Sequence, residues 1–125
     1  MTSWTIDVLL AEDDEDLREA MVDTLNDAGY SVAAVANGRD ALEWLEDTPT
    51  PPKIILLDLM MPVMDGWQFL SERQKTPKVA SVPVVVLSAN GSFLEQGGTV
   101  AFLRKPVAVK PLLELIAGYC SASRP

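Results

Sequence analysis

Two kinds of hydrophobic pattern alternate along the chain. Short continuous apolar runs are typical of strands buried on both faces, whereas apolar residues three or four positions apart indicate helices. Strands are therefore predicted over residues 6–11, 54–57, 82–87 and 100–103, and a looser alternation predicts a further strand over residues 31–36. Helical spacing falls between them, with inner faces marked in turn by Leu17, Ala20, Met21, Leu25 and Ala28, by Ala41, Leu42 and Leu45, by Phe69 and Leu70, and by residues 111–119.

Capping and breaking residues support these boundaries. Gly29 stands just beyond the first helix, at a position that often takes a left-handed conformation. Asn37 is a favoured N-cap for the second helix, and the proline-rich segment 49–52 ends it. Pro111 suits the first turn of the last helix. The pattern thus predicts discrete helices between the strands.

Five strands that alternate with helices predict a doubly wound α/β fold. Its sheet would be parallel, with helices on both faces and right-handed crossovers. The sequence contains no internal repeat and no linker long enough to divide it. We therefore expect one domain over residues 1–125, with a core over about residues 6–120.

Composition narrows the classes of partner and chemistry. The 125 residues carry a net charge of −8, which disfavours nucleic acid and anionic membranes as partners. Histidine is absent, so zinc and histidine-based catalysis are nearly excluded. The single cysteine, Cys120, cannot form an internal disulfide and indicates a reducing compartment. With no signal peptide and no apolar run near the ~20 residues of a membrane span, a cytoplasmic protein is expected.

Polar residues stand at the ends of the predicted strands. Glu12 and Asp13 follow the first strand, and Asp58 ends the third. Ser88 follows the fourth strand, and Lys105 comes after the fifth. In parallel α/β sheets the ligand site lies beyond the carboxyl ends of the strands. These side chains are therefore expected to meet in one crevice.

The clustered carboxylates favour a divalent cation. Oxygen-only ligands suit Mg²⁺, with Asp13 and Asp58 binding directly and Glu12 binding directly or through water. A lysine and a hydroxyl opposite them would hold a phosphoryl group. A carboxylate placed there is a nucleophile toward phosphorus and forms an acyl phosphate.

Each residue taken alone also has an ordinary structural explanation. The run over residues 12–16 suits a solvated helix start, because acidic residues favour that end of a helix. Asp58 alone suits a turn, Ser88 a turn or cap, and Lys105 a surface charge. Their joint placement at strand ends favours the functional interpretation. The EF-hand spacing and the P-loop motif are both absent from the sequence.

Four stretches together resemble the receiver domain of two-component response regulators. They are VLLAEDDEDLR, IILLDLMMPVMDG, VVVLSA and FLRKP, in the family's order and across about residues 6–120. The resemblance implies the flavodoxin-like strand order 2-1-3-4-5. It also implies that Asp58 is the phospho-accepting aspartate and that Glu12 and Asp13 are the acidic pair, with Asp13 a direct Mg²⁺ ligand. The backbone carbonyl of Met60 would be a further ligand.

The resemblance also implies a switch. Ser88 would contact the phosphoryl group, Lys105 would pair with it, and Phe102 would turn inward when the hydroxyl moves. The Lys105–Pro106 bond would be cis, as is common in the family. A sensor histidine kinase or phosphotransfer protein would donate the phosphoryl group, and an unidentified protein partner would respond to the changed surface.

One segment departs from the family pattern. Lys105 stands only 17 positions after Ser88, and residues 89–98 contain three glycines and few apolar side chains. Such a segment cannot form a long amphipathic helix. We therefore expect a shortened fourth helix. The family's usual dimer and output surface uses that helix, so this surface is not expected in its usual form.

Several functions fit these observations. The first expectation is a stand-alone response regulator that catalyses only its own phosphorylation and dephosphorylation. Alternatives are a receiver module of a hybrid histidine kinase and a Mg²⁺-dependent phosphohydrolase. The phosphohydrolase would place a second aspartate where Met60 stands. A degenerate, unphosphorylated receiver conflicts with the complete set of residues.

Overall fold

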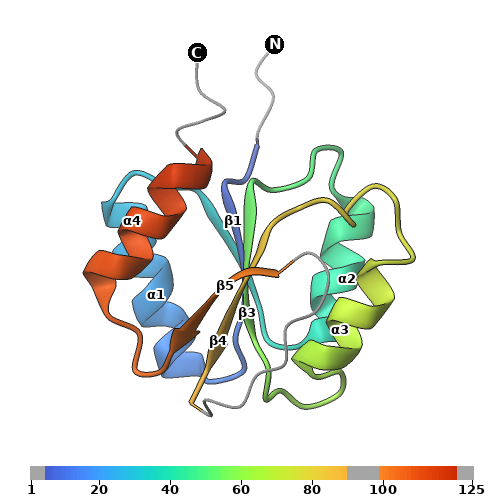
Figure 1. The fold of residues 1–125 in the computed structure, drawn as a ribbon, viewed down its shortest axis with the longest axis horizontal. Coiled ribbons are helices and arrows are strands. Elements are labelled where there is room, and N and C mark those ends of the chain that lie inside the picture. The colour runs from blue at the N-terminus through green and yellow to red at the C-terminus, as the bar shows by residue number, and fades with distance from the viewer. Residues whose placement is uncertain (1–4, 90–98, 121–125) are drawn as a thin grey trace.

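The chain folds around a five-stranded parallel sheet. The structure is a computed structural model that describes residues 5–89 and 99–120, with only the backbone of residues 99 and 100. The strands are β1 (Val8–Ala11), β2 (Val32–Val35), β3 (Ile54–Asp58), β4 (Val84–Ser88) and β5 (Thr99–Arg104). All neighbouring pairs are parallel, in the order β2-β1-β3-β4-β5 (Figure 1). The predicted fold class and strand order are confirmed.

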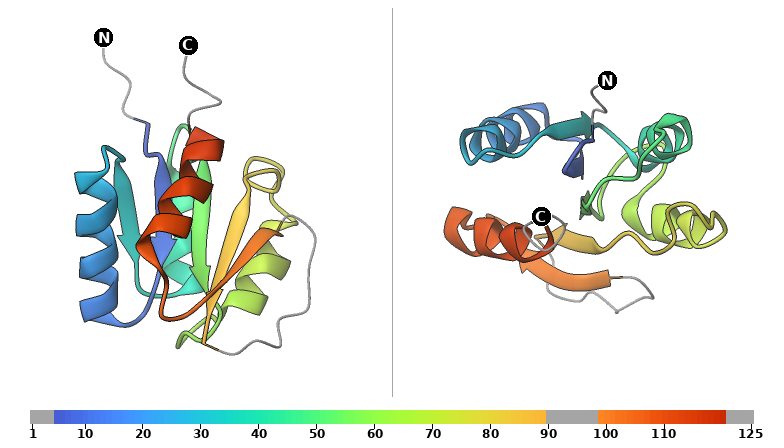
Figure 2. Two further views of the ribbon diagram at one scale, coloured as in Figure 1. Left: turned by 60° about the vertical axis from the view of Figure 1, so that its left-hand side comes forward. Right: turned by 90° about the horizontal axis from the view of Figure 1, so that it is seen from above.

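Four helices in the described residues cover the two faces of the sheet. They are α1 (Glu15–Asp27), α2 (Gly38–Asp47), α3 (Gly66–Arg73) and α4 (Val109–Cys120). Helices α1 and α4 lie on one face, and α2 and α3 lie on the other (Figures 1 and 2). None of the helices in the described part of the chain is long and apolar enough to cross a bilayer.

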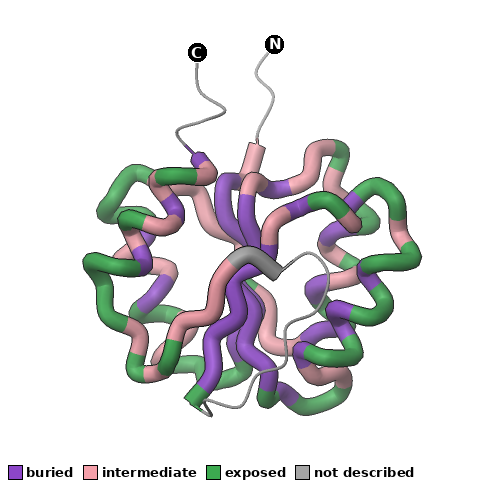
Figure 3. Tube along the Cα trace, viewed as in Figure 1, coloured by how far each residue is buried: buried purple, intermediate pink, exposed green. Residues whose placement is uncertain are grey.

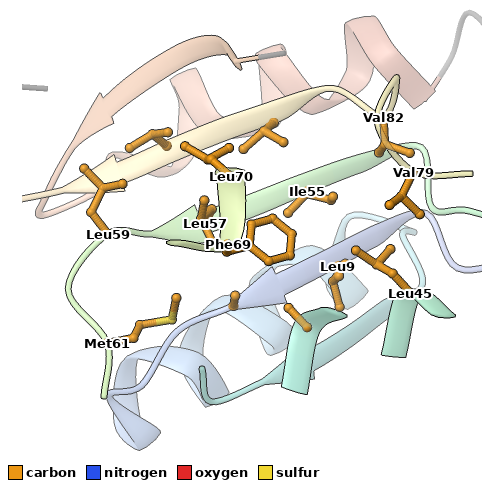
Figure 4. Close-up of a cluster of buried hydrophobic side chains, with 14 residues drawn as sticks. Leu9, Leu45, Ile55, Leu57, Leu59, Met61, Phe69, Leu70, Val79 and Val82 are labelled. Atoms are coloured by element: carbon orange, nitrogen blue, oxygen red, sulfur yellow. The ribbon is translucent and has the colours of Figure 1, made fainter. Parts of the chain in front are cut away.

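Alternate residues of the central strands fill two separate cores. In β1, Val8 and Leu10 pack with α1 and α4, whereas Leu9 and Ala11 pack with α2 and α3. Because both faces are covered, the strands are apolar throughout rather than alternating with polar residues. Figure 3 shows the central strands buried along their length, and Figure 4 shows the core on the α2 and α3 side.

The predicted caps are present. The side chain of Asn37 accepts the Asp40 N–H at the start of α2, and Gly29 follows α1 with a φ of 96°. Asp65 caps α3 in a capping box: its side chain accepts a hydrogen bond from the Gln68 N–H, and the Gln68 side chain accepts one from the Asp65 N–H. These local bonds fix where each helix leaves the sheet edge.

Two predictions need correction or lie outside the structure. Ala20 and Ala28, predicted on the inner face of α1, are exposed, because Met21 and Leu25 already fill the space against the sheet. The shortened fourth helix falls on residues 90–98, which lie outside the described residues. The cis Lys105–Pro106 bond is confirmed.

Arg73 is a buried cation that the sequence pattern did not single out. It lies at the end of α3 with no exposed surface. Its Nη2 donates to the carbonyls of Ala80 and Val82, at 2.8 and 2.5 Å. Burial lowers the pKa of the Arg73 guanidinium. Arg73 thus holds the turn that leads into β4.

Replacing Arg73 with methionine should lower the free energy of unfolding by about 2 kcal/mol. The carbonyls of Ala80 and Val82 lose their charged hydrogen-bond donor, which destabilises the fold. Removal of the buried charge also removes its desolvation cost, which offsets part of that loss. Urea denaturation measures the change, with the exposed Lys75→Met as a control that should differ little from the parent. An Arg73→Met protein as stable as the parent would show that the two effects cancel.

Candidate functional site

Three charged side chains from different strands meet at the carboxyl edge of the sheet. Glu12 follows β1, Asp58 is the last residue of β3, and Lys105 follows β5. The parallel register brings these strand ends to one edge, and the Lys105 N–H donates to the Ser88 carbonyl at 2.9 Å. As expected, these three side chains from widely separated parts of the chain lie close together at this edge.

Glu12 is fully buried and held at every polar group. Its Oε1 accepts from the Lys105 Nζ at 2.6 Å, and its Oε2 accepts from the Asp14 N–H at 3.0 Å. Its own N–H donates to the Val35 carbonyl at 3.0 Å. Both carboxylate oxygens thus have protein partners, as do both oxygens of Asp58, and each oxygen keeps a lone pair for a cation or a water.

Asp58 is buried, with 4% of its surface exposed. Its Oδ1 accepts the Met60 N–H at 3.2 Å, and its Oδ2 lies 3.2 Å from the Lys105 Nζ. Burial and the neighbouring Glu12 charge raise the pKa of Asp58 to about 7, against the opposing effects of the Met60 N–H and of Lys105. Without a cation, this carboxylate is therefore costly to ionise.

Lys105 joins the two buried carboxylates. Burial by itself lowers the pKa of Lys105, but its bonds and charge interactions with Glu12 and Asp58 outweigh burial, and the net shift is upward. The ammonium group is therefore held in its charged form. It is a fixed positive charge within 3.2 Å of an Asp58 oxygen.

Asp13 completes an acidic cluster in this site. Glu12, Asp13 and Asp58 each offer a carboxylate oxygen, and these oxygens lie within 4.8 Å of one another. Asp13 is exposed, while the other two are buried. The donor set contains only oxygen, which fits a hard divalent cation such as Mg²⁺. The residues present therefore fit the predicted metal.

The loop between β3 and α3 is pinned closely against Asp58. The Gly66 N–H donates to the Leu59 carbonyl, and a Cβ on Gly66 would lie 2.7 Å from the Asp58 carbonyl oxygen. Met60 and Val63 extend from this loop with 68% and 73% of their surfaces exposed. Only glycine at position 66 permits this close approach of backbone to backbone.

The two predicted switch residues lie on neighbouring strands. Ser88 is buried at the end of β4, and Phe102 of β5 pairs in register with Val86. Phe102 is partly buried and packs against the core on the α2 and α3 side. The Ser88 hydroxyl therefore lies near the carboxyl edge of the sheet. Phe102 lies on the neighbouring strand, two residues before the residue that pairs with Ser88.

Arg18 and Gly66 contribute to the site, although the sequence analysis gave them no role. Arg18 lies within the quoted stretch VLLAEDDEDLR, and its Nη1 donates to the Glu12 carbonyl at 2.9 Å. An available signal was the single positive charge among the acidic residues that open α1. For Gly66 the available signal was the Asp-Gly pair shortly after a buried aspartate.

With this geometry established, comparisons with known proteins define the class. Residues 8–117 match the family described as response regulator receiver domain. The chain belongs to that family.

Two relatives of this chain differ in length. An uncharacterized 14.6 kDa protein of Leptolyngbya boryana is 31% identical over 125 residues, covering 96% of this chain and 94% of that protein. Response regulator Rre1 of Synechocystis is 36% identical over 107 residues. That match covers 81% of this chain but only 46% of Rre1, so the chain spans about half the length of this relative.

Solved structures share the whole fold. The receiver domain of sensor histidine kinase PA1611 from Pseudomonas aeruginosa superposes with a TM-score of 0.83 at 26% identity, covering 94% of this chain and 99% of that one. That structure holds a magnesium ion in its active site cleft. Chemotaxis protein CheY4 of Vibrio cholerae superposes with a TM-score of 0.81 at 27% identity, covering 93% and 99% of the respective chains.

Proposed function

We propose that this chain is the phospho-accepting receiver of a two-component phosphorelay. Asp58 takes a phosphoryl group from a phosphohistidine of a sensor histidine kinase or phosphotransfer protein. The observation that carries the proposal is the placement of Asp58, with Lys105 Nζ 3.2 Å from one oxygen and two further carboxylates alongside. A buried carboxylate between a fixed ammonium group and a cation site suits nucleophilic attack on phosphorus.

Mg²⁺ is the proposed cofactor. Asp13 and Asp58 would hold it directly, Glu12 directly or through a water, and Met60 through its backbone carbonyl. The all-oxygen cluster supports this ligand set, as does the magnesium ion in the PA1611 receiver domain. When bound, Mg²⁺ supplies charge neutralisation for the carboxylates and for the transferring phosphoryl oxygens.

The chain's own residues would carry the transfer as follows. A carboxylate oxygen of Asp58 forms a bond to phosphorus while the bond from phosphorus to the donor imidazole nitrogen breaks. The electron pair of that bond leaves with the imidazole. Lys105 offsets negative charge on a phosphoryl oxygen, and the Ser88 hydroxyl donates a hydrogen bond to another.

The phosphorylated form would then act on a protein partner. Movement of Ser88 toward the phosphoryl group would let Phe102 turn inward and shift the population of surface conformations. We propose a single-domain cytoplasmic regulator that catalyses only its own phosphorylation and dephosphorylation. The relative of matching length in Leptolyngbya boryana supports the single-domain form. The hybrid-kinase alternative gains support from the PA1611 receiver.

Incubation with Mg²⁺ and acetyl phosphate tests the proposal. The parent should gain the mass of one phosphoryl group, whereas Asp58→Asn should gain none, because an amide is not a nucleophile toward phosphorus. Glu114→Gln, which removes an exposed acid on α4, should behave like the parent. Equal labelling of Asp58→Asn and the parent would contradict the assignment of Asp58.

The phosphorylated parent should lose its phosphoryl group slowly. Met60 stands two residues after the acceptor and carries no polar group to orient an attacking water. Replacing Met60 with glutamate should accelerate hydrolysis by roughly tenfold, because a carboxylate can act as a general base. Decay of the phosphorylated mass after removal of acetyl phosphate measures the rate. A parent half-life of seconds would contradict this account of Met60.

A further inference from the structure

Arg18 connects helix α1 to the backbone of the acidic site. Its Nη1 donates to the Glu12 carbonyl at 2.9 Å. That carbonyl belongs to the peptide unit that joins Glu12 to Asp13. Because a peptide unit is planar, its orientation determines where the next residue begins. Arg18 therefore acts on the path of the chain into Asp13, the exposed member of the cluster.

The other contacts of Glu12 make this bond informative. The Glu12 N–H and both carboxylate oxygens are bonded to Val35, Lys105 and Asp14. Lys105 and Asp14 fix the side chain, and Val35 fixes the amide that precedes it. The hydrogen bond from Arg18 fixes the carbonyl that leads on to Asp13. Without the Arg18 side chain, the Glu12 carbonyl loses the hydrogen-bond donor that it has among the described residues.

The guanidinium group of Arg18 forms no ion pair in the described part of the chain. None of the ion pairs formed there involves Arg18. Its side chain also borders a hollow on the α1 surface that is open to solvent and is lined by Glu19, Val22, Asp23 and Ala34. Shortening Arg18 therefore enlarges a solvent-filled space and leaves no closed cavity in a core.

We propose that Arg18 is a positioning residue that sets the affinity of the acidic cluster for Mg²⁺ by orienting the peptide between Glu12 and Asp13. This inference rests on the proposed function. Partners that orient metal ligands typically change metal affinity by about 10–100-fold when removed. Simple charge effects act in the opposite direction, because removing a nearby cation makes the site more attractive to Mg²⁺. The sign of the change therefore separates positioning from electrostatics.

Isothermal titration calorimetry with Mg²⁺ tests the proposal. Arg18→Met, which keeps the aliphatic stem but loses donor and charge, should weaken Mg²⁺ binding about tenfold. Arg18→Lys retains a donor and should recover most of that loss. Lys75→Met removes one exposed positive charge two residues beyond α3 and should bind as the parent does. In the metal-free protein, the Asp13 and Asp14 amide resonances should move in Arg18→Met.

Arg18→Met binding that equals or exceeds that of the parent would overturn the proposal. Thermal unfolding in EDTA checks that each variant is folded, and Arg18→Gln replaces Arg18→Met under the same criteria if methionine does not fold. Asp13→Asn should lose binding in the same titration. If the parent itself fails to bind Mg²⁺, the proposed function is wrong as well, whereas a parent that binds with an unaffected Arg18→Met rejects only the role of Arg18.

Discussion

Replacing Asp58 with asparagine is expected to raise the free energy of unfolding of the metal-free protein by roughly 4 kcal/mol at pH 8. Burial and the charge of Glu12 raise the pKa of Asp58 to about 7 in the folded protein. In the unfolded chain an aspartate titrates near its ordinary value of about 3.9. Ionised Asp58 therefore destabilises the fold, and a neutral amide of similar shape removes that cost.

The pH dependence follows from the direction of this shift. Below about pH 4 the carboxyl is protonated in both states, so Asp58 costs nothing. As pH rises toward 7, the unfolded chain ionises first and the parent loses stability. Above pH 7 the loss is complete and constant. The stability gained by Asp58→Asn should therefore be small at pH 4, grow up to about pH 7 and then level off.

Urea unfolding in EDTA at several pH values measures this difference. Glu114→Gln serves as the control, since it removes one exposed negative charge far along α4. Adding Mg²⁺ should stabilise the parent more than Asp58→Asn, because a ligand of the folded state stabilises it by mass action. If Asp58→Asn were less stable than the parent at pH 8 in EDTA, attraction by Lys105 would outweigh burial and repulsion by Glu12.

Replacing Gly66 with alanine should lower the free energy of unfolding by about 3 kcal/mol. The added Cβ would lie 2.7 Å from the Asp58 carbonyl oxygen and 2.7 Å from the Leu59 Cα. Both contacts are with backbone, so the loop or the end of β3 must shift. A displacement of the acceptor carboxylate should also slow phosphorylation by acetyl phosphate by on the order of tenfold or more.

Gly118→Ala provides the matched control. Gly118 lies in α4, and a Cβ built there meets no atom within 4 Å. Alanine favours the helix over glycine by up to about 1 kcal/mol, so this variant should be as stable as the parent or more so. Urea unfolding and phosphorylation rates measure both variants. If Gly66→Ala matched the parent in stability and phosphorylation rate, close packing of Gly66 against the Asp58 backbone would not be required.

The site was largely predictable because sheet geometry converts sequence order into position. Glu12, Asp58 and Lys105 each follow an apolar run, and parallel strands bring those ends to one edge. Apolar runs also identified β1, β3, β4 and β5, because strands covered on both faces are apolar on both faces, whereas a looser alternation identified β2. The exposure of Ala20 and Ala28 was not predictable, because alanine is compatible with either face of a helix.

The contacts of Arg73 and Arg18 could not be predicted from the sequence. Arg73 follows Phe69 by four residues and Leu70 by three, which places it on the inner face of α3. Arginine is nevertheless mostly exposed in proteins, and only the path of the turn after α3 provides the carbonyls that bind it in the interior. Arg18 similarly reaches the Glu12 carbonyl because α1 begins at Glu15, which places Arg18 within the first turns of the helix that follows the site.

Chemical trapping of the phosphorylated residue tests the central claim most directly. Borohydride reduces an acyl phosphate to an alcohol, so an aspartyl phosphate becomes homoserine. After treatment with Mg²⁺, acetyl phosphate and then borohydride, peptide mass spectrometry should locate homoserine at position 58 in the parent and at no position in Asp58→Asn. Homoserine at another aspartate in the parent, or a stable phosphate ester on Ser88 without change at Asp58, would contradict the assignment of Asp58 as the acceptor.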